Sequence, residues 1–243
     1  MYLLLGWKRI IREKVVQIKM GESEMKYRLI IFDMDGTILD TLEDLTDSTN
    51  YALSVNGFKE RTIDEVRSFV GNGIHKLIER AVPEGTDEAV VEKVFKDFVP
   101  YYKENCAVKT KPYDGITEVI KHLRENGFIT AVVSNKAHFA VQELCRDYFP
   151  DMFDMAIGEH EGIRRKPYPD AVEEVINKFG VSKEETIYIG DSEVDIQTAV
   201  NAGIDKICVE WGFREHDFLV EHGGENFAVT PDDILKFIDK CEN

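Results

Sequence analysis

From residue 26 onward, short apolar runs alternate with longer segments whose apolar residues recur at helical spacing. The runs predict buried strands at residues 29–32, 129–133, 155–157, 186–189 and 207–209. The helical patterns cover residues 114–126, 137–146, 169–179, 194–202 and 230–238. Strand and helix in strict turn indicate a parallel sheet that is covered by helices on both faces. We therefore predict an α/β protein with a doubly wound parallel sheet, whose ligands bind at the carboxyl ends of the strands.

Residues 42–109 interrupt this alternation, because they contain almost no strand-like run. Thr62-Ile63-Asp64-Glu65 has the pattern of a capping box, which predicts a helix start. Gly71-Asn72-Gly73 separates that helix from the next, and residues 87–102 predict a longer helix. We predict a small all-helical domain at 42–109, inserted into a core made of residues 26–41 and 110–243.

The first 25 residues have a four-residue apolar run that is followed by basic residues. This order is the reverse of a secretory signal, and the run is far too short to span a membrane. We interpret residues 1–25 as a poorly packed extension. Met25 leads directly into the first strand, which favours Met25 as the native start of the protein.

The formal net charge of −16 argues against non-specific nucleic-acid binding and against docking on an anionic membrane. Such a field also repels an anionic substrate, so any phosphate site has to be built locally. The cysteines are widely spaced, which predicts free thiols and a reducing cytoplasm. They are Cys106, Cys145, Cys208 and Cys241.

Two aspartates separated by one residue follow the first strand, in the string FDMDGTILDT. In a functional interpretation, Asp33 is a nucleophile that accepts a phosphoryl group. Asp35 is then the general acid for the leaving alcohol and later the base for water. Gly36 permits a tight turn, and its amide and Thr37 would hold phosphate oxygens. The competing interpretation is a carboxylate-rich turn that caps a helix.

The second and third strands are followed by polar residues that could complete a phosphate site. Ser134 and Asn135 follow the second strand in VVSNK, where Ser134 could equally be a helix cap. Lys166 precedes Pro167 after the third strand. A lone lysine is usually a solvated surface charge, but a phosphoryl group approaching carboxylates requires a cation.

The fourth strand ends in YIGDSEVDIQTA, where Asp191 and Asp195 lie four residues apart at a helix start. A helix cap that includes Ser192 is the plain interpretation. The functional interpretation is a Mg²⁺ site formed by Asp33, the carbonyl of Asp35 and Asp191. Asp195 would hold a metal-bound water or orient Lys166.

The motifs DMDGT, SNK, Lys-Pro and GDSEVD, in that order, resemble those of the haloacid dehalogenase superfamily, which has a Rossmann-like core. The helical insert lies where the cap lies in the subclass that includes phosphoglycolate phosphatase. The resemblance implies a Mg²⁺-dependent phosphatase that acts on a small phosphate monoester through a phospho-aspartate. It also implies a small phosphorylated metabolite as the partner, while monomer and homodimer both remain open.

Other activities remain as alternatives. A sugar phosphomutase of the same superfamily would need a cap arginine, for which Arg61 and Arg67 are in roughly the right region, but its characteristic string is not present. A pyrophosphatase is also open. A phospho-aspartate switch that acts by binding is a non-enzymatic alternative, but the helical insert and the turn at Asp35 to Thr37 argue against it.

Several inserted residues are candidates for substrate contacts. The amides of Gly71, Asn72 and Gly73 could meet a substrate carboxylate, although a simple glycine turn is at least as good an interpretation. A group of aromatic residues on the long helix is favoured as the core of the inserted domain: Phe95, Phe98, Tyr101 and Tyr102. For Trp211-Gly212-Phe213-Arg214, packing against the inserted domain is favoured over lining an entrance.

Overall fold

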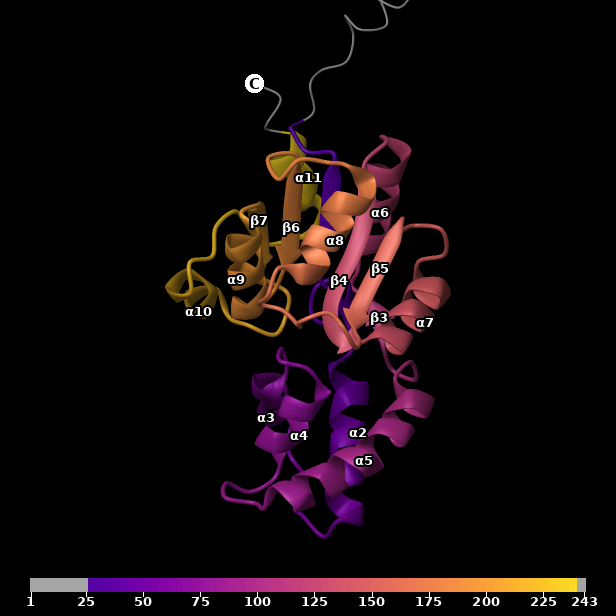
Figure 1. Cartoon of the computed structure of the whole chain (residues 1–243), viewed down its shortest axis with the longest axis vertical. Helices are drawn as coiled ribbons and strands as arrows, with labels where there is room; N and C mark the ends of the chain where they lie inside the picture. The colour runs from indigo at the N-terminus through magenta and orange to yellow at the C-terminus, as the bar shows by residue number, and fades with distance from the viewer. Residues whose placement is uncertain (1–25, 240–243) are drawn as a thin grey trace, which may run out of the picture.

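The computed structural model describes residues 26–239, so the extension 1–25, with Met25, and Cys241 lie outside the described residues. A six-stranded sheet forms the centre of the larger part of the molecule, and every pair of neighbouring strands is parallel (Figure 1). Its strands, in spatial order, are β5 (Met155–Glu159), β4 (Ile129–Ala137), β1 (Leu29–Phe32), β6 (Thr186–Gly190), β7 (Asp205–Val209) and β8 (Phe227–Ala228). The predicted α/β fold with a parallel sheet is therefore confirmed.

Helices cover both faces of this sheet. Ile30 and Phe32 of β1 pack with α6 (Ile116–Glu125), α7 (His138–Tyr148) and α11 (Pro231–Asp239). Leu29 and Ile31 point to the other face, towards α8 (Asp170–Phe179) and α9 (Glu193–Ala202). A short helix, α10 (His216–Glu221), packs Leu219 near β7 and β8. Strand residues alternate between the two faces, so β1 contributes to the apolar cores on both sides of the sheet. Burying one large apolar side chain stabilises the fold by roughly 1.5–3 kcal/mol.

Four helices form a separate unit at the carboxyl ends of the strands (Figure 1). They are α2 (Leu42–Val55), α3 (Ile63–Phe69), α4 (Ile74–Ala81) and α5 (Glu88–Asn105). This helical unit has its own apolar cluster, to which Phe213 from the loop after β7 is added. The capping box predicted at Thr62 and Glu65 is present at the start of α3. No helix among residues 26–239 is long and apolar enough to cross a membrane.

The two chain segments that connect the core to the helical unit are hydrogen-bonded to each other. The antiparallel pair β2 (Leu39–Asp40) and β3 (Lys111–Pro112) joins them at the sheet side. The buried carboxylate of Asp44, in the first turn of α2, accepts N–H bonds from Lys109 at 3.0 Å and Thr110 at 2.8 Å. Bonds to a charged acceptor are stronger than neutral ones, so Asp44 fixes the return of the chain to the core.

Some local expectations were wrong. β4 continues through Ser134 to Ala137, where its pairing with β5 is irregular, and Ala137 is the N-cap of α7. The helix-cap interpretation of Ser134 therefore fails, because Ser134 is part of a strand. Pro169 lies one position before α8 as its N-cap, instead of at the first helical position. The sequence patterns did not predict β2, β3, β8 or α10, which are too short to show a period, and they did not single out α2 within the inserted domain.

Candidate active site

Asp33 and Asp35 lie in the turn that follows β1, at the carboxyl ends of the neighbouring strands β1 and β6. Asp33 N–H donates to Ile189 O at 2.9 Å, which extends the strand pairing to the aspartate itself. Gly36 has φ +82°, and a Cβ at this position would lie 2.3 Å from Asp191 Oδ2. Only glycine fits here, because both the backbone conformation and the close approach to Asp191 exclude a side chain.

Asp191 and Asp195 lie at the junction of β6 and α9. Asp191 Oδ1 accepts a hydrogen bond from the hydroxyl of Thr37 at 3.2 Å, and Asp191 Oδ2 accepts one from Phe213 N–H at 2.8 Å. Asp195 Oδ2 accepts bonds from Asp191 N–H at 3.2 Å, from Ser192 N–H at 3.1 Å and from the Ser192 hydroxyl at 2.6 Å. Ser192 and Asp195 thus fix the turn that presents Asp191.

Lys166 lies between two of these carboxylates. Its Nζ is 2.9 Å from Asp33 Oδ1 and 2.7 Å from Asp195 Oδ1, and it donates to the Tyr188 hydroxyl at 3.0 Å. Burial opposes the charge on Lys166, but Asp195 and Asp33 outweigh it and hold the pKa of the ammonium well above its usual value. Asn135 secures the backbone of Lys166 from both sides, accepting its N–H at 2.8 Å and donating to its carbonyl at 3.0 Å.

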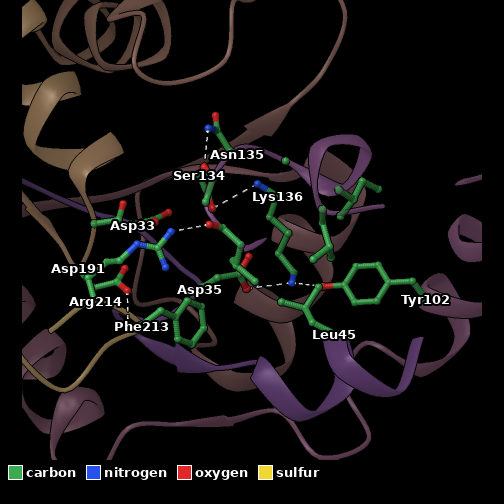
Figure 2. Close-up of a pocket in the computed structure, with 16 residues that line it drawn as sticks. Asp33, Asp35, Leu45, Tyr102, Ser134, Asn135, Lys136, Asp191, Phe213 and Arg214 are labelled. Atoms are coloured by element: carbon green, nitrogen blue, oxygen red, sulfur yellow. Dashed lines mark hydrogen bonds and ion pairs between the residues drawn. The ribbon is translucent and has the colours of Figure 1, made fainter. Parts of the chain in front are cut away.

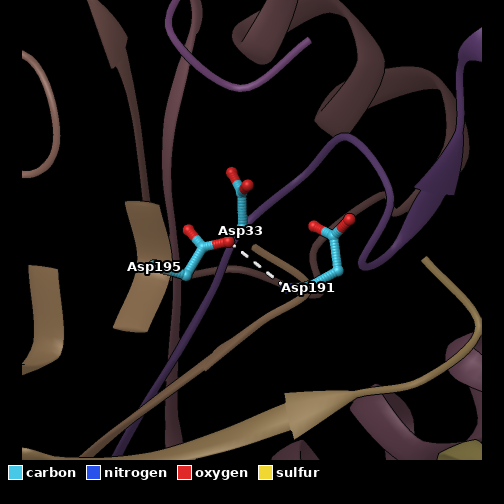
Figure 3. Close-up of side chains that lie close together, drawn as sticks. All are labelled: Asp33, Asp191 and Asp195. Carbon is cyan, nitrogen blue, oxygen red and sulfur yellow. Dashed lines mark hydrogen bonds between the residues drawn. The ribbon is translucent and has the colours of Figure 1, made fainter. Parts of the chain in front are cut away.

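Three buried carboxylates share this corner with a single lysine. Asp33, Asp191 and Asp195 each offer an oxygen within 4.8 Å of the others (Figure 3). Burial raises the pKa of Asp33 to about 7, against the lowering effect of Lys166. Burial, with Asp195 and Asp33 nearby, also raises the pKa of Asp191 well above its usual value. This excess of negative charge is what a divalent cation neutralises.

The oxygen donors present fit Mg²⁺, which prefers carboxylate and carbonyl ligands. Both oxygens of Asp195 already accept bonds, from Lys166 on one side and from the Asp191–Ser192 turn on the other. Asp191 accepts one bond on each oxygen, and Asp33 Oδ1 is buried with no well-aligned donor. Asp195 Oδ2 accepts three bonds, whereas no oxygen of Asp33 or Asp191 accepts more than one, so most of the free ligand capacity lies on Asp33 and Asp191.

A small cavity lies between this corner and the helical unit (Figure 2). Its core side includes the predicted Asp33, Asp35, Ser134, Asn135, Asp191 and Ser192. Its apolar wall is formed by Leu45, Val70, Ile74, Leu77 and Phe213. Because its lining combines charged and apolar side chains, the cavity suits a small anion with a modest apolar portion.

Three polar residues of the cavity were not assigned to the site from the sequence: Tyr102, Lys136 and Arg214. The packing predicted for Phe213 and Tyr102 is confirmed, since both are buried in the helical unit's cluster, but the Tyr102 hydroxyl also reaches the site. Lys136 is the last residue of the SNK motif, so its place in that motif could have identified it as a site residue. No local pattern distinguishes Arg214 from a surface arginine.

The loop between α3 and α4 lies against the core through three successive carbonyls. Arg214 Nη2 donates to Val70 O at 2.8 Å, Asn135 Nδ2 to Gly71 O at 3.1 Å, and Arg165 Nη1 to Asn72 O at 3.0 Å. The structure thus holds the helical unit closed over the cavity through hydrogen bonds from three separate core segments.

The four candidate residues of the helical unit divide into two groups. Gly71 and Gly73 line the cavity. The Asn72 side chain instead accepts a bond from Arg80 at 3.1 Å, and Arg67 lines a neighbouring hollow with Tyr113 and Trp211. The structure therefore does not bring the side chains of Arg67 and Asn72 into the cavity with the aspartates.

Comparison with known proteins gives consistent matches along most of the chain. A family model described as haloacid dehalogenase-like hydrolase matches residues 30–209. The phosphoglycolate phosphatase of Aquifex aeolicus is 30% identical, over 87% of this chain and 97% of its own. The N-acetylmuramic acid 6-phosphate phosphatase of Pseudomonas aeruginosa is 28% identical, over 90% of this chain and 98% of its own.

A crystal structure from Lactobacillus delbrueckii subsp. bulgaricus, of a protein provisionally described as a phosphoglycolate phosphatase, has the same fold. It is 41% identical, with a TM-score of 0.84 over 88% of this chain and 99% of its own. The match includes the helical unit as well as the sheet, because nearly all of that chain is covered.

Proposed function

Because the chain belongs to the haloacid dehalogenase-like hydrolases, we propose that it is a Mg²⁺-dependent phosphatase of a small phosphate monoester. The observation that supports this most is the convergence of Asp33, Lys166 and Asp191 at the carboxyl end of β1. Phosphoryl transfer through an aspartate requires a carboxylate nucleophile, a cation in a fixed position and a second carboxylate that can bind a metal ion.

In the first step, an Asp33 oxygen attacks the phosphorus of the ester. The bond from phosphorus to the leaving oxygen breaks, both of its electrons stay on that oxygen, and the carboxyl of Asp35 supplies the proton. The products are an alcohol and phospho-Asp33. Lys166, 2.9 Å from Asp33 Oδ1, balances the negative charge that the phosphoryl group brings.

In the second step, water attacks the phosphorus of phospho-Asp33 while the Asp35 carboxylate accepts the proton from the water. The bond from phosphorus to the Asp33 oxygen breaks, which releases inorganic phosphate and restores the Asp33 carboxylate. Asp35 regains the proton that it gave up in the first step, so the cycle balances. The Ser134 hydroxyl, which lines the cavity, is the proposed donor to a phosphate oxygen. The predicted donors Gly36 and Thr37 are already engaged, because the Gly36 N–H donates to Leu39 O at 2.9 Å and the Thr37 hydroxyl donates to Asp191 Oδ1 at 3.2 Å.

Asp33, the carbonyl of Asp35 and Asp191 would hold the Mg²⁺ ion. When bound, the ion supplies positive charge that lets a phosphate approach a carboxylate and that orients the attack. Asp195 is the proposed support for this arrangement, because it fixes Lys166 and the Asp191 turn at once. We place the enzyme in the cytoplasm, which fits the free, buried thiols of Cys106, Cys145 and Cys208.

The proposed substrate is a small phosphate ester that carries a carboxylate, as phosphoglycolate does. The two named relatives act on phosphoglycolate and on N-acetylmuramic acid 6-phosphate, and both of these esters contain a carboxylate. Arg214 and Lys136 line the cavity, where Arg214 is paired with Glu193 at 3.1 Å and Lys136 with Asp35 at 2.9 Å. The position of Arg67 in a separate hollow gives no support to the phosphomutase alternative.

The test is phosphate release from a panel of esters with Mg²⁺. The panel contains phosphoglycolate, N-acetylmuramic acid 6-phosphate, two sugar phosphates, a nucleoside monophosphate and pyrophosphate. We expect the highest kcat/KM for a carboxylate-bearing ester. A preference for pyrophosphate would favour the pyrophosphatase alternative, and no release from any member would reject the proposal.

We expect Asn72→Ala to change substrate preference more than the chemical step. The Asn72 side chain and Arg80 shape the loop whose glycines line the cavity, but neither side chain touches the aspartates. The ratio of kcat/KM between the two best esters should shift by about 3–10-fold, with kcat on the best ester within about 3-fold. The control is Asn126→Ala, which removes a similar side chain at the end of α6, outside the cavity. An equal fall in kcat for all esters would contradict this expectation.

We expect stabilisation by Mg²⁺ to depend on pH. The folded state binds a proton on Asp33 more tightly than the unfolded chain, because burial raises its pKa to about 7. That contribution to stability is fully present below about pH 4 and is lost as the pH rises through about 7. Mg²⁺ competes with this proton, so saturating Mg²⁺ should raise Tm by about 5 °C at pH 8 and less than half as much at pH 5.5.

Differential scanning calorimetry with and without Mg²⁺ measures this difference. KCl at equal ionic strength and the Asp191→Asn variant are the controls, and both should show little shift at either pH. Equal shifts at pH 5.5 and pH 8 in the parent protein would show that ion binding does not compete with protonation of the buried carboxylates.

A further inference from the structure

A second buried lysine contacts the other predicted catalytic aspartate. Lys136 Nζ lies 2.9 Å from Asp35 Oδ1, and its side chain is only 1% exposed. It also donates a hydrogen bond to the hydroxyl of Tyr102, and it lies 4.9 Å from the centre of that ring (Figure 2). Lys136 comes from β4 of the core, whereas Tyr102 comes from α5 of the helical unit.

The two lysines of the site have separate partners. Lys166 contacts Asp33 and Asp195, whereas Lys136 contacts Asp35. Each of the two aspartates predicted to do chemistry therefore has its own ammonium group. A buried ammonium requires a charged or strongly hydrogen-bonding partner, and Asp35 and Tyr102 together satisfy Lys136.

We propose that Lys136 is a positioning residue for Asp35, and that Tyr102 makes this positioning depend on closure of the helical unit. The inference rests on the proposed phosphatase function, in which Asp35 transfers a proton in both steps. With Oδ1 held by Lys136, the orientation of the carboxyl group is fixed, and Oδ2 accepts no hydrogen bond from residues 26–239. Oδ2 is then the oxygen that exchanges protons with the leaving group and with water.

Tyr102 supplies the dependence on closure. It is buried to 1% exposure and stacks on Phe98 of the same helix, with ring centres 5.1 Å apart, so its hydroxyl is placed rigidly by α5. Movement of the helical unit away from the sheet would take this hydroxyl from Lys136. The ammonium would then be held by Asp35 and solvent alone, and Asp35 would lose its fixed orientation. Proton transfer would therefore be efficient only when the unit covers the cavity and excludes bulk water.

A charge pair that serves folding alone is the competing explanation, and the hydrolysis of p-nitrophenyl phosphate can distinguish the two. The p-nitrophenolate leaving group departs without a proton, so attack by Asp33 does not require Asp35 as an acid. The second step still requires Asp35 as a base. A poorly oriented Asp35 should therefore let phospho-Asp33 accumulate, which appears as a burst of p-nitrophenolate before a slow steady rate.

The experiment compares Lys136→Met and Tyr102→Phe with the parent protein in stopped-flow assays with Mg²⁺. For Lys136→Met we expect a burst near one equivalent per enzyme and a steady rate about 10–100-fold lower. For Tyr102→Phe we expect the same signature with a loss of about 3–10-fold, since the ammonium remains. A purely structural role would instead reduce burst and steady rate together, in proportion to the folded fraction, and that result would overturn the inference.

Neighbouring residues on α5 provide matched controls. Lys103→Met removes an exposed ammonium that lies 5.7 Å from the ring centre of Phe139, and Tyr101→Phe removes a hydroxyl from a ring stacked on Tyr51. Neither contacts Asp35, so both variants should match the parent. If Lys136→Met does not fold, Tyr102→Phe still tests the inference, because it removes a single oxygen atom.

A double-mutant cycle with Asp35→Asn separates this inference from the proposed function. If Lys136 acts only through Asp35, the double variant should be no more than about 2-fold slower than Asp35→Asn alone. Multiplicative losses would show an independent role for Lys136 and would overturn the inference alone. Unchanged hydrolysis in Asp35→Asn would instead refute the proposed role of Asp35, and with it the mechanism from which this inference starts.

Discussion

Asp33→Asn is expected to abolish phosphate release, with a loss of at least about 10⁴-fold in kcat. An amide oxygen is a far weaker nucleophile than a carboxylate, and the neighbouring carboxylate of Asp195 has both oxygens engaged, by Lys166 and by the Asp191–Ser192 turn. The fold should survive, because burial already disfavours the charged form of Asp33. Without Mg²⁺, the Tm of the variant at pH 8 should equal or exceed that of the parent.

The decisive measurement is transfer of the phosphoryl group to the protein. With p-nitrophenyl phosphate labelled in its phosphate, whose leaving group needs no proton, Asp35→Asn should retain label on the chain, whereas Asp33→Asn should retain none. Asp217→Asn, an exposed acid at the start of α10, provides the control for a change of one charge. Substantial activity or protein-bound label in Asp33→Asn would mean that the nucleophile lies elsewhere.

The sheet could be predicted because its strands are buried on both faces and its helices are amphipathic. Residues 29–32 are entirely apolar, and the helix at Ile116–Glu125 buries Ile116, Val119, Ile120 and Leu123 at the expected spacing. Parallel strands bring their carboxyl ends to one edge. From that topology the sequence predicts that Asp33, Asp191 and Lys166 lie together, and the family resemblance is confirmed by the matches to known proteins.

The contacts between the core and the helical unit could not be predicted in this way. Lys136 and Tyr102 are 34 positions apart, and Arg214 lies 147 positions from Arg67, whose carbonyl accepts its bond. Periodicity shows which face of a helix is buried, but it does not show what that face meets. Tyr102 was correctly interpreted as an apolar packing residue, yet its hydroxyl has a separate partner that depends on how two units are placed.

Because Asp191 is a proposed Mg²⁺ ligand, Asp191→Asn is the second variant for which we expect a very large loss of activity. Asp191 has free ligand capacity on a buried carboxylate, and an amide provides a neutral, weaker ligand for Mg²⁺. The same substitution can change the bond that Asp191 Oδ1 accepts from Thr37. We expect a loss of about 10³-fold or more at 1 mM Mg²⁺, with partial recovery at much higher Mg²⁺.

The partial recovery of activity at high Mg²⁺ concentration is what would identify Asp191 as a metal ligand. A residue that only supports the turn would lower kcat at every Mg²⁺ concentration, whereas a ligand shifts the concentration that gives half of the maximal rate. Titration of Asp191→Asn and Asp217→Asn with Mg²⁺ measures this, and EDTA should remove the activity of the parent until Mg²⁺ is restored. An Asp191→Asn enzyme with the parent's Mg²⁺ dependence would exclude Asp191 as a ligand, because the weaker amide cannot hold the ion equally well.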